Sequence, residues 1–289
     1  MNEAKYYYRI GEENTVICTL CPHNCSIHEG DTGYCRVREN KGGKLYSLTY
    51  GYISSMALDA IEKKPLKRFY EGKKVFSIGS YGCNFSCSFC QNYMISQEYS
   101  LDFSSSEYHT PQKIVEISQS LKKSDNIGIA YTYNESLINY EFILEIGKLI
   151  HENNMKNVLV TNGFINDEPL IELIPYIDAA NIDLKGFSKE FYSMLDGDLE
   201  AVKRSIKTLY EYCHIEVTTL VIPTENDSVK EIDSLCSWLA SIDPSIPLHL
   251  SRFFPRYKYS SKKPTDVNTL YELAKVAKKH LKYVYIGNV

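Results

Sequence analysis

The sequence predicts an α/β protein whose parallel strands alternate with helices, preceded by a small cysteine-rich unit. From residue 73 onwards, strand-like runs alternate with segments whose apolar residues recur at helical spacing. Such alternation is typical of a parallel sheet with crossover helices. Seven of the nine cysteines fall within the first 90 residues. The length of 289 residues suits one large α/β domain with a small appendage.

We expect a cysteine-rich N-terminal unit over residues 1–70 and a barrel domain over residues 71–289. A strand is expected at Lys44–Tyr50 in the first unit, and six strand–helix units would make a partial barrel in the second. The strands of the barrel domain are expected at Val75–Gly79, Ile127–Tyr133, Asn157–Thr161, Ala179–Leu184, Ile215–Ile222, Leu248–Phe253 and Tyr283–Ile286. The helices are expected at Gln112–Lys123, Leu137–Glu152, Glu168–Ile174, Leu199–Tyr212, Val229–Ala240 and Val267–Leu281. Asp227 and Ser228 are both candidate N-caps for the helix that begins at Val229.

The composition is that of an ordinary soluble globular protein, with 44% hydrophobic and 24% charged residues. The net charge of −4 gives no indication of nucleic-acid or anionic-membrane binding. No apolar run is long enough to span a bilayer, and the first residues lack the apolar core of a secretory signal. We therefore expect a cytoplasmic protein, in which nine cysteines indicate metal or redox chemistry rather than disulfides.

Three cysteines lie within eight residues with the spacing C-x3-C-x2-C, and Phe89 precedes the last of them. We call Cys83, Cys87 and Cys90 the cysteine triad. Three thiolates can hold three corners of a [4Fe–4S] cluster, which normally has four cysteine ligands. The fourth iron is then open to a substrate or cofactor, as in a catalytic metal site. The alternatives are a tight zinc loop or incidental thiols, but the residues directly after Cys90 are poor ligands for zinc.

This segment resembles the signature of radical S-adenosylmethionine (radical SAM) enzymes. The resemblance implies a partial (β/α)6 radical SAM barrel and a [4Fe–4S] cluster whose open iron is chelated by the amino and carboxylate groups of SAM. It also implies an enzyme that cleaves SAM reductively and abstracts a hydrogen from its substrate. In barrels of this type the chemistry sits at the carboxyl ends of the strands.

The wider sequence resembles the radical SAM member of the AmmeMemoRadiSam group, which is similar to the pyruvate formate-lyase activating enzymes. The resemblance covers nearly the whole chain. Its main segments are Cys18–Cys25, Glu62–Leu66, Gly82–Phe85 with Cys90–Asn92, Tyr131–Glu135 and Ser251–Pro255. It implies a flavodoxin or ferredoxin as electron donor, and a protein or peptide substrate such as a glycyl radical enzyme or an AmmeMemoRadiSam partner. Members often continue into a Cys-Pro-x-x-Cys tail after the segment that matches Tyr285–Val289. This sequence does not include that tail.

The resemblance assigns SAM-binding roles to residues near the first three strand ends. Phe89 would lie against the adenine, or be a packing residue only. The segment Tyr133-Asn134-Glu135 stands where many radical SAM enzymes have Gly-Gly-Glu, so the Glu135 carboxylate or the Asn134 carbonyl could accept from the SAM amino group. An acidic residue at a helix N-terminus is the alternative for Glu135. Thr161 and Asn162 would lie near the SAM ribose or methionine, or belong to an Asn-Gly turn.

Residues of the later strands follow the same resemblance. Asp183 and Lys185 look like the Asp-x-Lys element of enzymes that activate glycyl radical enzymes, and a local ion pair is the alternative. The related enzymes carry an arginine on the fifth strand, but the stretch His214–Pro223 has none. Glu216 is the candidate for a SAM contact on that strand, or one polar residue of a strand face. His249 stands where these enzymes have a histidine near the ribose, or is a satisfied core histidine.

Four cysteines in the N-terminal unit form a second candidate metal site. We call Cys18, Cys21, Cys25 and Cys35 the cysteine tetrad. Four thiolates at this spacing can close a tetrahedral zinc site or hold a second [4Fe–4S] cluster. His23 and His28 are alternative ligands, and free thiols are the alternative to any metal. A structural metal is expected because so short a unit buries little core. The sequence does not decide between zinc and a second cluster, and we favour zinc slightly.

Three functional hypotheses follow from these patterns. The first is the generation of a glycyl radical on a protein, which the Asp-x-Lys element favours and the missing arginine and Gly-Gly pair oppose. The second is radical modification of a different peptide, protein or small molecule within the AmmeMemoRadiSam partnership. The third is a non-catalytic iron–sulfur or zinc module for binding or sensing.

Overall fold

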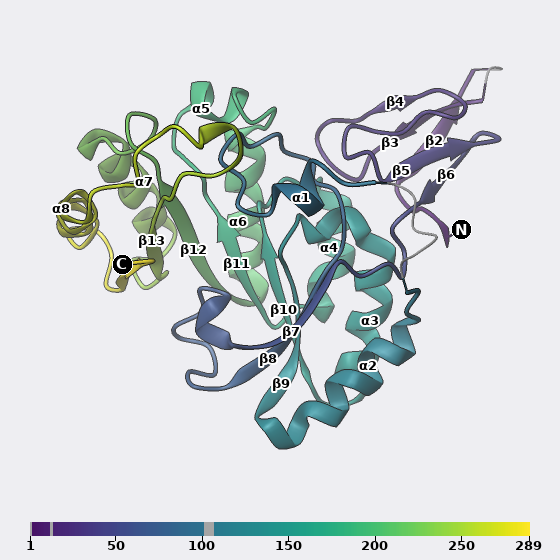
Figure 1. Cartoon of the computed structure of the whole chain (residues 1–289), viewed down its shortest axis with the longest axis horizontal. Coiled ribbons are helices and arrows are strands. Elements are labelled where there is room, and N and C mark those ends of the chain that lie inside the picture. The colour runs from purple at the N-terminus through teal and green to yellow at the C-terminus, as the bar shows by residue number, and fades with distance from the viewer. Residues whose placement is uncertain (1, 12–13, 101–106) are drawn as a thin grey trace.

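The computed structural model describes residues 2–11, 14–100 and 107–289, and within them an eight-stranded sheet forms the centre (Figure 1). The strand order is β14-β13-β12-β11-β10-β9-β8-β7. Strands β8 to β14 are parallel, and β7 is antiparallel to β8 at one edge. The strands are β7 (Ser55–Ala60), β8 (Lys74–Gly79), β9 (Asn126–Tyr131), β10 (Lys156–Thr161), β11 (Ala179–Asp183), β12 (His214–Val221), β13 (Leu248–Arg252) and β14 (Val284–Gly287).

The connections between these strands carry the helices, which Figure 1 shows arranged around the sheet from α2 and α3 to α8. The α-helices are α1 (Tyr93–Ser96), α2 (Pro111–Ser120), α3 (Tyr140–Glu152), α4 (Asp167–Leu173), α5 (Lys189–Ser193), α6 (Leu199–Tyr212), α7 (Val229–Ile242) and α8 (Val267–Ala277). The 3-10 helices are η1 (Ile61–Lys63), η2 (Leu121–Ser124), η3 (Ser136–Asn139), η4 (Ile174–Tyr176) and η5 (Tyr257–Tyr259). Ser228 is the N-cap of α7, because its side chain accepts from the backbone N–H of Glu231. Asp227 instead accepts from the backbone N–H of Thr224.

The inner strands of the sheet are buried along almost their whole length, as expected for parallel strands covered on both faces. Close approach of the strands also restricts residue size. A Cβ added to Gly128 on β9 would lie 1.8 Å from the carbonyl oxygen of Lys156 on β10. Only glycine fits at this position without moving the two strands apart.

The N-terminal residues form two three-stranded sheets in the described part of the chain. Figure 1 shows these sheets (purple) beside the large sheet, close to α1 and α4. Their strands are β1 (Asn2–Glu3), β6 (Lys44–Ser47) and β5 (Arg38–Lys41) in one sheet, and β2 (Tyr7–Ile10), β3 (Thr15–Cys18) and β4 (Ser26–Ile27) in the other. Arg38, which is 1% exposed, donates from Nη2 to both carboxylate oxygens of Glu141 on α3, at 2.6 and 2.8 Å. Removing one partner of such a buried pair costs about 3–5 kcal/mol, so this contact ties the small sheets to the large one.

The α/β fold with its parallel sheet is confirmed, and the predicted barrel strands and helices are all present with ends displaced by a few residues. Two of the displaced ends have a physical cause, because the 3-10 helices η2 and η3 occupy positions where α-helix is predicted at the end of α2 and the start of α3. Strand β7 is not predicted from the sequence; it is a half-exposed edge strand with no clear alternation. The division at residues 70 and 71 and the six-unit barrel stay predictions, although β7 already belongs to the large sheet. No helix among the described residues is long and apolar enough to cross a membrane.

Candidate active site

A cavity of about 380 Å³ lies at the carboxyl ends of the parallel strands, and we call it the carboxyl-end cavity. Each parallel strand, or the loop directly after it, contributes to its lining. The lining residues that bear on the chemistry are Cys83, Cys87, Phe89, Cys90, Asn134, Glu135, Thr161, Asn162, Asp183, Lys185, Thr218, Ser251 and Asn288. The parallel topology therefore collects polar and thiol groups from segments more than 200 residues apart.

The loop after β8 brings the cysteine triad into this cavity, and two asparagines hold the loop in place. Asn134 accepts from the backbone N–H of Ser80 at 3.0 Å and donates to the carbonyl of Gly82 at 2.9 Å. Asn84 donates to the carbonyl of Phe164 at 2.8 Å and accepts from Asn162 at 2.8 Å. The loop is thus anchored to the ends of β9 and β10, which fixes the triad relative to the neighbouring strands.

Burial sets the protonation of Cys83 and Cys87 in the absence of a metal. It raises the pKa of the Cys87 thiol to about 12, against the opposing charge of Lys185. Burial, together with the charges of Cys87 and Glu135, also raises the pKa of Cys83 well above its usual range. These thiols are therefore protonated at neutral pH without a ligand, and metal binding must release their protons.

The triad lines the carboxyl-end cavity, whose volume of about 380 Å³ is larger than a single metal ion requires. No three His, Cys, Asp or Glu side chains in the described part of the chain are arranged so that they could hold one metal ion. A cubane cluster makes a different demand, because each thiolate binds a different iron. Three thiols around one cavity, with no fourth cysteine lining it, are the donor set of a cluster with one open iron.

Glu135 places a buried carboxylate at the wall of the cavity. The side chain is 3% exposed and accepts from Thr161 Oγ1 at 2.7 Å, from the backbone N–H of Asn162 at 2.7 Å and from that of Leu137 at 3.0 Å. Burial raises the pKa of Glu135, although these hydrogen bonds oppose the shift. The contact with Leu137 caps η3, so the capping role and the cavity position coexist. A carboxylate held in this way can accept from an ammonium group.

Asp183 and Lys185 form an ion pair at the end of β11, with Lys185 Nζ 2.9 Å from Asp183 Oδ2. Burial opposes the charge of Lys185, but Asp183 and the nearby Cys87 and Cys83 outweigh it and raise the lysine pKa. The Lys185 side chain is 16% exposed and the Asp183 side chain 36%. The pair therefore presents a partly open carboxylate and a positive charge next to the triad.

Phe89 is 5% exposed and lines the cavity, with its ring centroid 6.2 Å from Phe191 and 6.0 Å from Tyr259. The ring therefore packs against other aromatic residues and faces the cavity at the same time. Both interpretations of Phe89 made from the sequence fit this position, so its contact with adenine stays a prediction.

Glu216 and His249 are not among the cavity-lining residues, and they bind each other through His249 Nε2 and Glu216 Oε2 at 2.6 Å. Glu216 also accepts from His214 at 3.0 Å, and from the backbone N–H groups of Lys67 at 3.0 Å and Arg68 at 2.7 Å. Burial opposes its charge, but these hydrogen bonds lower the pKa of Glu216 to about 2. The observed contacts hold the Lys67–Arg68 backbone, and the SAM-binding roles of both residues stay predictions.

Some residues of the cavity cannot be recognised as site residues from the sequence. Lys64 is 4% exposed, pairs with Asp59 at 2.8 Å and lies 4.7 Å from the centroid of the Tyr133 ring. The Tyr133 carbonyl accepts from Asn92 at 2.6 Å, and Tyr133 has a positive φ of 73°. The segment Glu62–Leu66 is part of the family resemblance, but nothing in its residue types indicates that Lys64 reaches the cavity.

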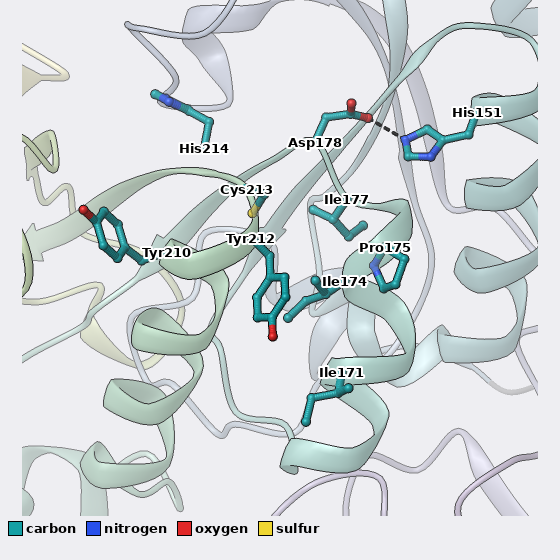
Figure 2. A pocket seen from close by; sticks show the side chains of 10 residues that line it. All are labelled: His151, Ile171, Ile174, Pro175, Ile177, Asp178, Tyr210, Tyr212, Cys213 and His214. Carbon is teal, nitrogen blue, oxygen red and sulfur yellow. Dashed lines mark hydrogen bonds and ion pairs between the residues drawn. The ribbon is translucent and has the colours of Figure 1, made fainter.

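A larger pocket of about 810 Å³ opens at the opposite, amino ends of β11 and β12, and we call it the amino-end pocket. Figure 2 shows apolar side chains of the α4–η4 segment facing side chains from the end of α6, with the His151–Asp178 contact at one side. Asp178 accepts from His151 and the backbone N–H of Asn157 at 2.8 Å, and from Lys156 at 2.7 Å. The carboxylate of Asp178 is thus partnered within the protein, and the pocket lies at the opposite end of the strands from the triad. We assign the chemistry to the smaller cavity.

Comparison with known proteins decides the family. Residues 77–236 match the family model described as the radical SAM superfamily. The chain belongs to the radical SAM superfamily. The match covers the triad loop and strands β9 to β12, so a radical SAM enzyme with a [4Fe–4S] cluster and SAM as cofactors is established at this level. Membership of the AmmeMemoRadiSam group stays a prediction.

Individual relatives match over most of the chain. The chain is 40% identical over 293 residues to the uncharacterized protein MJ0808 of Methanocaldococcus jannaschii, covering 100% of this chain and 86% of the relative. It is 25% identical over 212 residues to a putative glycyl-radical enzyme activating enzyme, MJ1632, of the same organism, covering 71% and 77%. A radical SAM methyltransferase structure from Sphaerobacter thermophilus matches with a TM-score of 0.56 at 14% identity, covering 75% and 67%. At that identity the likeness concerns the fold alone.

Proposed function

We propose that this radical SAM enzyme cleaves SAM reductively and abstracts a hydrogen atom from a protein or peptide substrate, with a glycyl radical as the product. The observation that carries the proposal is the convergence of the cysteine triad, Glu135 and the Asp183–Lys185 pair on one cavity. A bound cluster would supply the electron that breaks the sulfonium bond of SAM. The protein's own part is to bind, orient and shield the reacting groups.

Each group in the cavity has a proposed task. The triad thiolates would hold three irons, and the space beside them is open to the amino and carboxylate groups of SAM. Glu135 would accept from the SAM ammonium, which its three hydrogen bonds already orient it to do. Asn134, Thr161 and Asn162 would complete the polar wall around SAM.

The Asp183–Lys185 pair supports the activating-enzyme class of reaction. Its lysine lies close enough to the triad that Cys87 and Cys83 raise the lysine pKa. A positive charge at this position would attract the SAM carboxylate. The similarity to the putative activating enzyme from M. jannaschii supports the same class. We therefore propose a protein glycine as the hydrogen donor, with a flavodoxin or ferredoxin as the electron donor.

The N-terminal tetrad belongs to the same proposal as the site of a second metal centre. Its cysteines, like all nine in the chain, are free thiols. Zinc and a second cluster are the two candidates for this site.

The substrate class can be tested through transfer of deuterium to 5′-deoxyadenosine. The reconstituted enzyme is incubated with SAM, dithionite and an extract of cells grown on α-deuterated glycine, separated into protein and small-molecule fractions. We expect deuterium in 5′-deoxyadenosine with the protein fraction. Deuterium transfer from the small-molecule fraction alone would contradict a protein substrate. A bound cluster without any cleavage of SAM would favour the binding or sensing module.

A further inference from the structure

The two cysteine-bearing loops of the chain are in direct contact, although they belong to different sheets. His23, inside the tetrad loop, donates from Nε2 to the carbonyl of Asn84 at 2.8 Å. Asn84 directly follows Cys83 of the triad. On the other side, a Cβ added to Gly82 would lie 2.8 Å from the carbonyl oxygen of Cys35. The backbone at the start of the triad therefore packs against the backbone of the fourth tetrad cysteine.

A tyrosine strengthens this junction. Tyr99, which follows α1, donates from its hydroxyl to the carbonyl of Cys35 at 3.0 Å. The same hydroxyl would be 2.9 Å from a Cβ on Gly82. Gly82 has a positive φ of 84°, so this close contact depends on glycine in a conformation that L-residues rarely adopt.

The tetrad thiols also lie close to one another. The backbone N–H of Cys18 donates to the carbonyl of Cys25 at 3.0 Å, and the backbone N–H of Tyr34 donates to Cys25 Sγ at 3.3 Å. Tyr34 directly precedes Cys35, so these two hydrogen bonds bring the segments of Cys18, Cys25 and Cys35 together.

The spacing of the donors favours a cluster over zinc. Cys18, Cys21 and Cys25 lie within eight residues, as the triad does, and Cys35 follows alone. Three close cysteines with a distant fourth are typical of cluster ligation, as in the C-x4-C-x2-C…C pattern, whereas structural zinc is commonly held by paired ligands. The alternative histidine ligands are engaged elsewhere, His23 with Asn84 and His28 Nδ1 with Thr15 Oγ1 at 3.1 Å.

We propose that the cysteine tetrad holds a [4Fe–4S] cluster that relays electrons to the cluster on the triad. This inference rests on the proposed function, because the relay has a task only if the triad cluster is reduced to cleave SAM. One electron from a low-potential one-electron donor reduces the tetrad cluster from the 2+ to the 1+ state. That electron then passes to the triad cluster, which goes from 2+ to 1+ while the tetrad cluster returns to 2+. No bond or proton is exchanged between the clusters.

The test uses the full chain, reconstituted anaerobically with iron and sulfide. We expect about eight irons per chain, little zinc and two reduced cluster signals in electron paramagnetic resonance (EPR) spectra. In rapid-freeze samples the tetrad signal should appear before the triad signal, which alone responds to SAM. About four irons with about one zinc per chain would overturn the proposal. Appearance of the triad signal first would overturn the relay, and neither result depends on a variant that must fold.

A double variant locates the second cluster. Cys21→Ser with Cys25→Ser should lose about four irons, keep the SAM-responsive signal and lose the fast phase of triad reduction. Cys213→Ser, at the amino-end pocket, is the matched control and should keep both clusters. An unchanged fast phase in the double variant would contradict the relay.

The same samples separate the two proposals when 5′-deoxyadenosine is assayed. SAM cleavage by a chain with about four irons and about one zinc would refute the second cluster and leave the proposed function intact. About eight irons without cleavage would refute the proposed function and leave the second cluster intact.

Discussion

The carboxyl and amino ends of the parallel sheet both carry hollows, but they differ in size and chemistry. The amino-end pocket has a volume of about 810 Å³ and the carboxyl-end cavity about 380 Å³. Yet Asp178 of the larger pocket is bound by His151, Lys156 and a backbone N–H. The smaller cavity gathers three thiols, a carboxylate and an ion pair from successive strand ends. We therefore propose that the donor set, rather than volume, identifies the end of the sheet at which the chemistry occurs.

Glu135 and Glu216 are two buried carboxylates that can be compared directly. Glu135 lines the carboxyl-end cavity, whereas Glu216 is not among the lining residues. We expect Glu135→Gln to weaken SAM binding roughly 10–100-fold, because hydrogen bonds to charged groups contribute about 1.5–3 kcal/mol. Equilibrium dialysis of SAM against the reconstituted protein measures the change. Equal weakening by Glu216→Gln would show that the cavity lining does not separate the two residues.

Glu216 should matter for stability instead. Its folded pKa of about 2 lies below the unfolded value of about 4.3. The stabilisation is therefore complete above about pH 4.3 and is lost as the pH falls towards 2. Glu216→Gln should lower the free energy of unfolding at neutral pH by about 1.5–3 kcal/mol and flatten the acid dependence. Urea unfolding across this pH range is the measurement, and an unchanged acid dependence would disagree with the assigned contacts.

Lys185 and Lys156 are two ion-paired lysines at opposite ends of the sheet, and their variants can be compared directly. Lys185→Met should weaken SAM binding about tenfold, which corresponds to about 1.4 kcal/mol, because a positive charge beside the triad is lost. It should also make the triad cluster harder to reduce, since the local charge affects the potential. Lys156→Met removes the same charge at the amino end and should change neither property. A redox titration followed by EPR separates the two variants, and identical potentials would count against the position assigned to Lys185.

The smallest effect is expected at Asp178. Its hydrogen bonds with Lys156, the backbone N–H of Asn157 and His151 lower its pKa against the effect of burial. The stabilisation is present above the unfolded value of about 3.9 and disappears as the pH falls through the lowered pKa. Asp178→Asn should reduce stability by about 1 kcal/mol and leave SAM affinity unchanged. Weaker SAM binding in this variant would indicate that the amino end takes part in function.

The sequence predicts the parts of this protein that depend on local pattern. Strand–helix alternation gives the parallel sheet, and C-x3-C-x2-C gives the triad, because both are short-range signals. Residues directly after strands, such as Glu135 and Lys185, are predictable because parallel strands bring their carboxyl ends to one edge.

The remaining features depend on long-range packing that the sequence does not display. Lys64 reaches the cavity because β7 and η1 lie beside β8. An edge strand without alternating apolar residues is not predictable from the sequence, and so the position of Lys64 is not predictable either. Glu216 looks like a site residue on its strand, and its histidine and backbone partners become visible only in the fold. The contact between Gly82 and Cys35 joins two sheets and likewise has no local signature.

The most direct test of the central claim is SAM cleavage by Cys87→Ala compared with Cys213→Ala. Both variants remove one thiol, the first from the carboxyl-end cavity and the second from the amino-end pocket. After anaerobic reconstitution, each is given SAM and dithionite and assayed for 5′-deoxyadenosine. We predict no product from Cys87→Ala and the wild-type amount from Cys213→Ala. Wild-type product from Cys87→Ala would contradict the assignment of the chemistry to the cysteine triad.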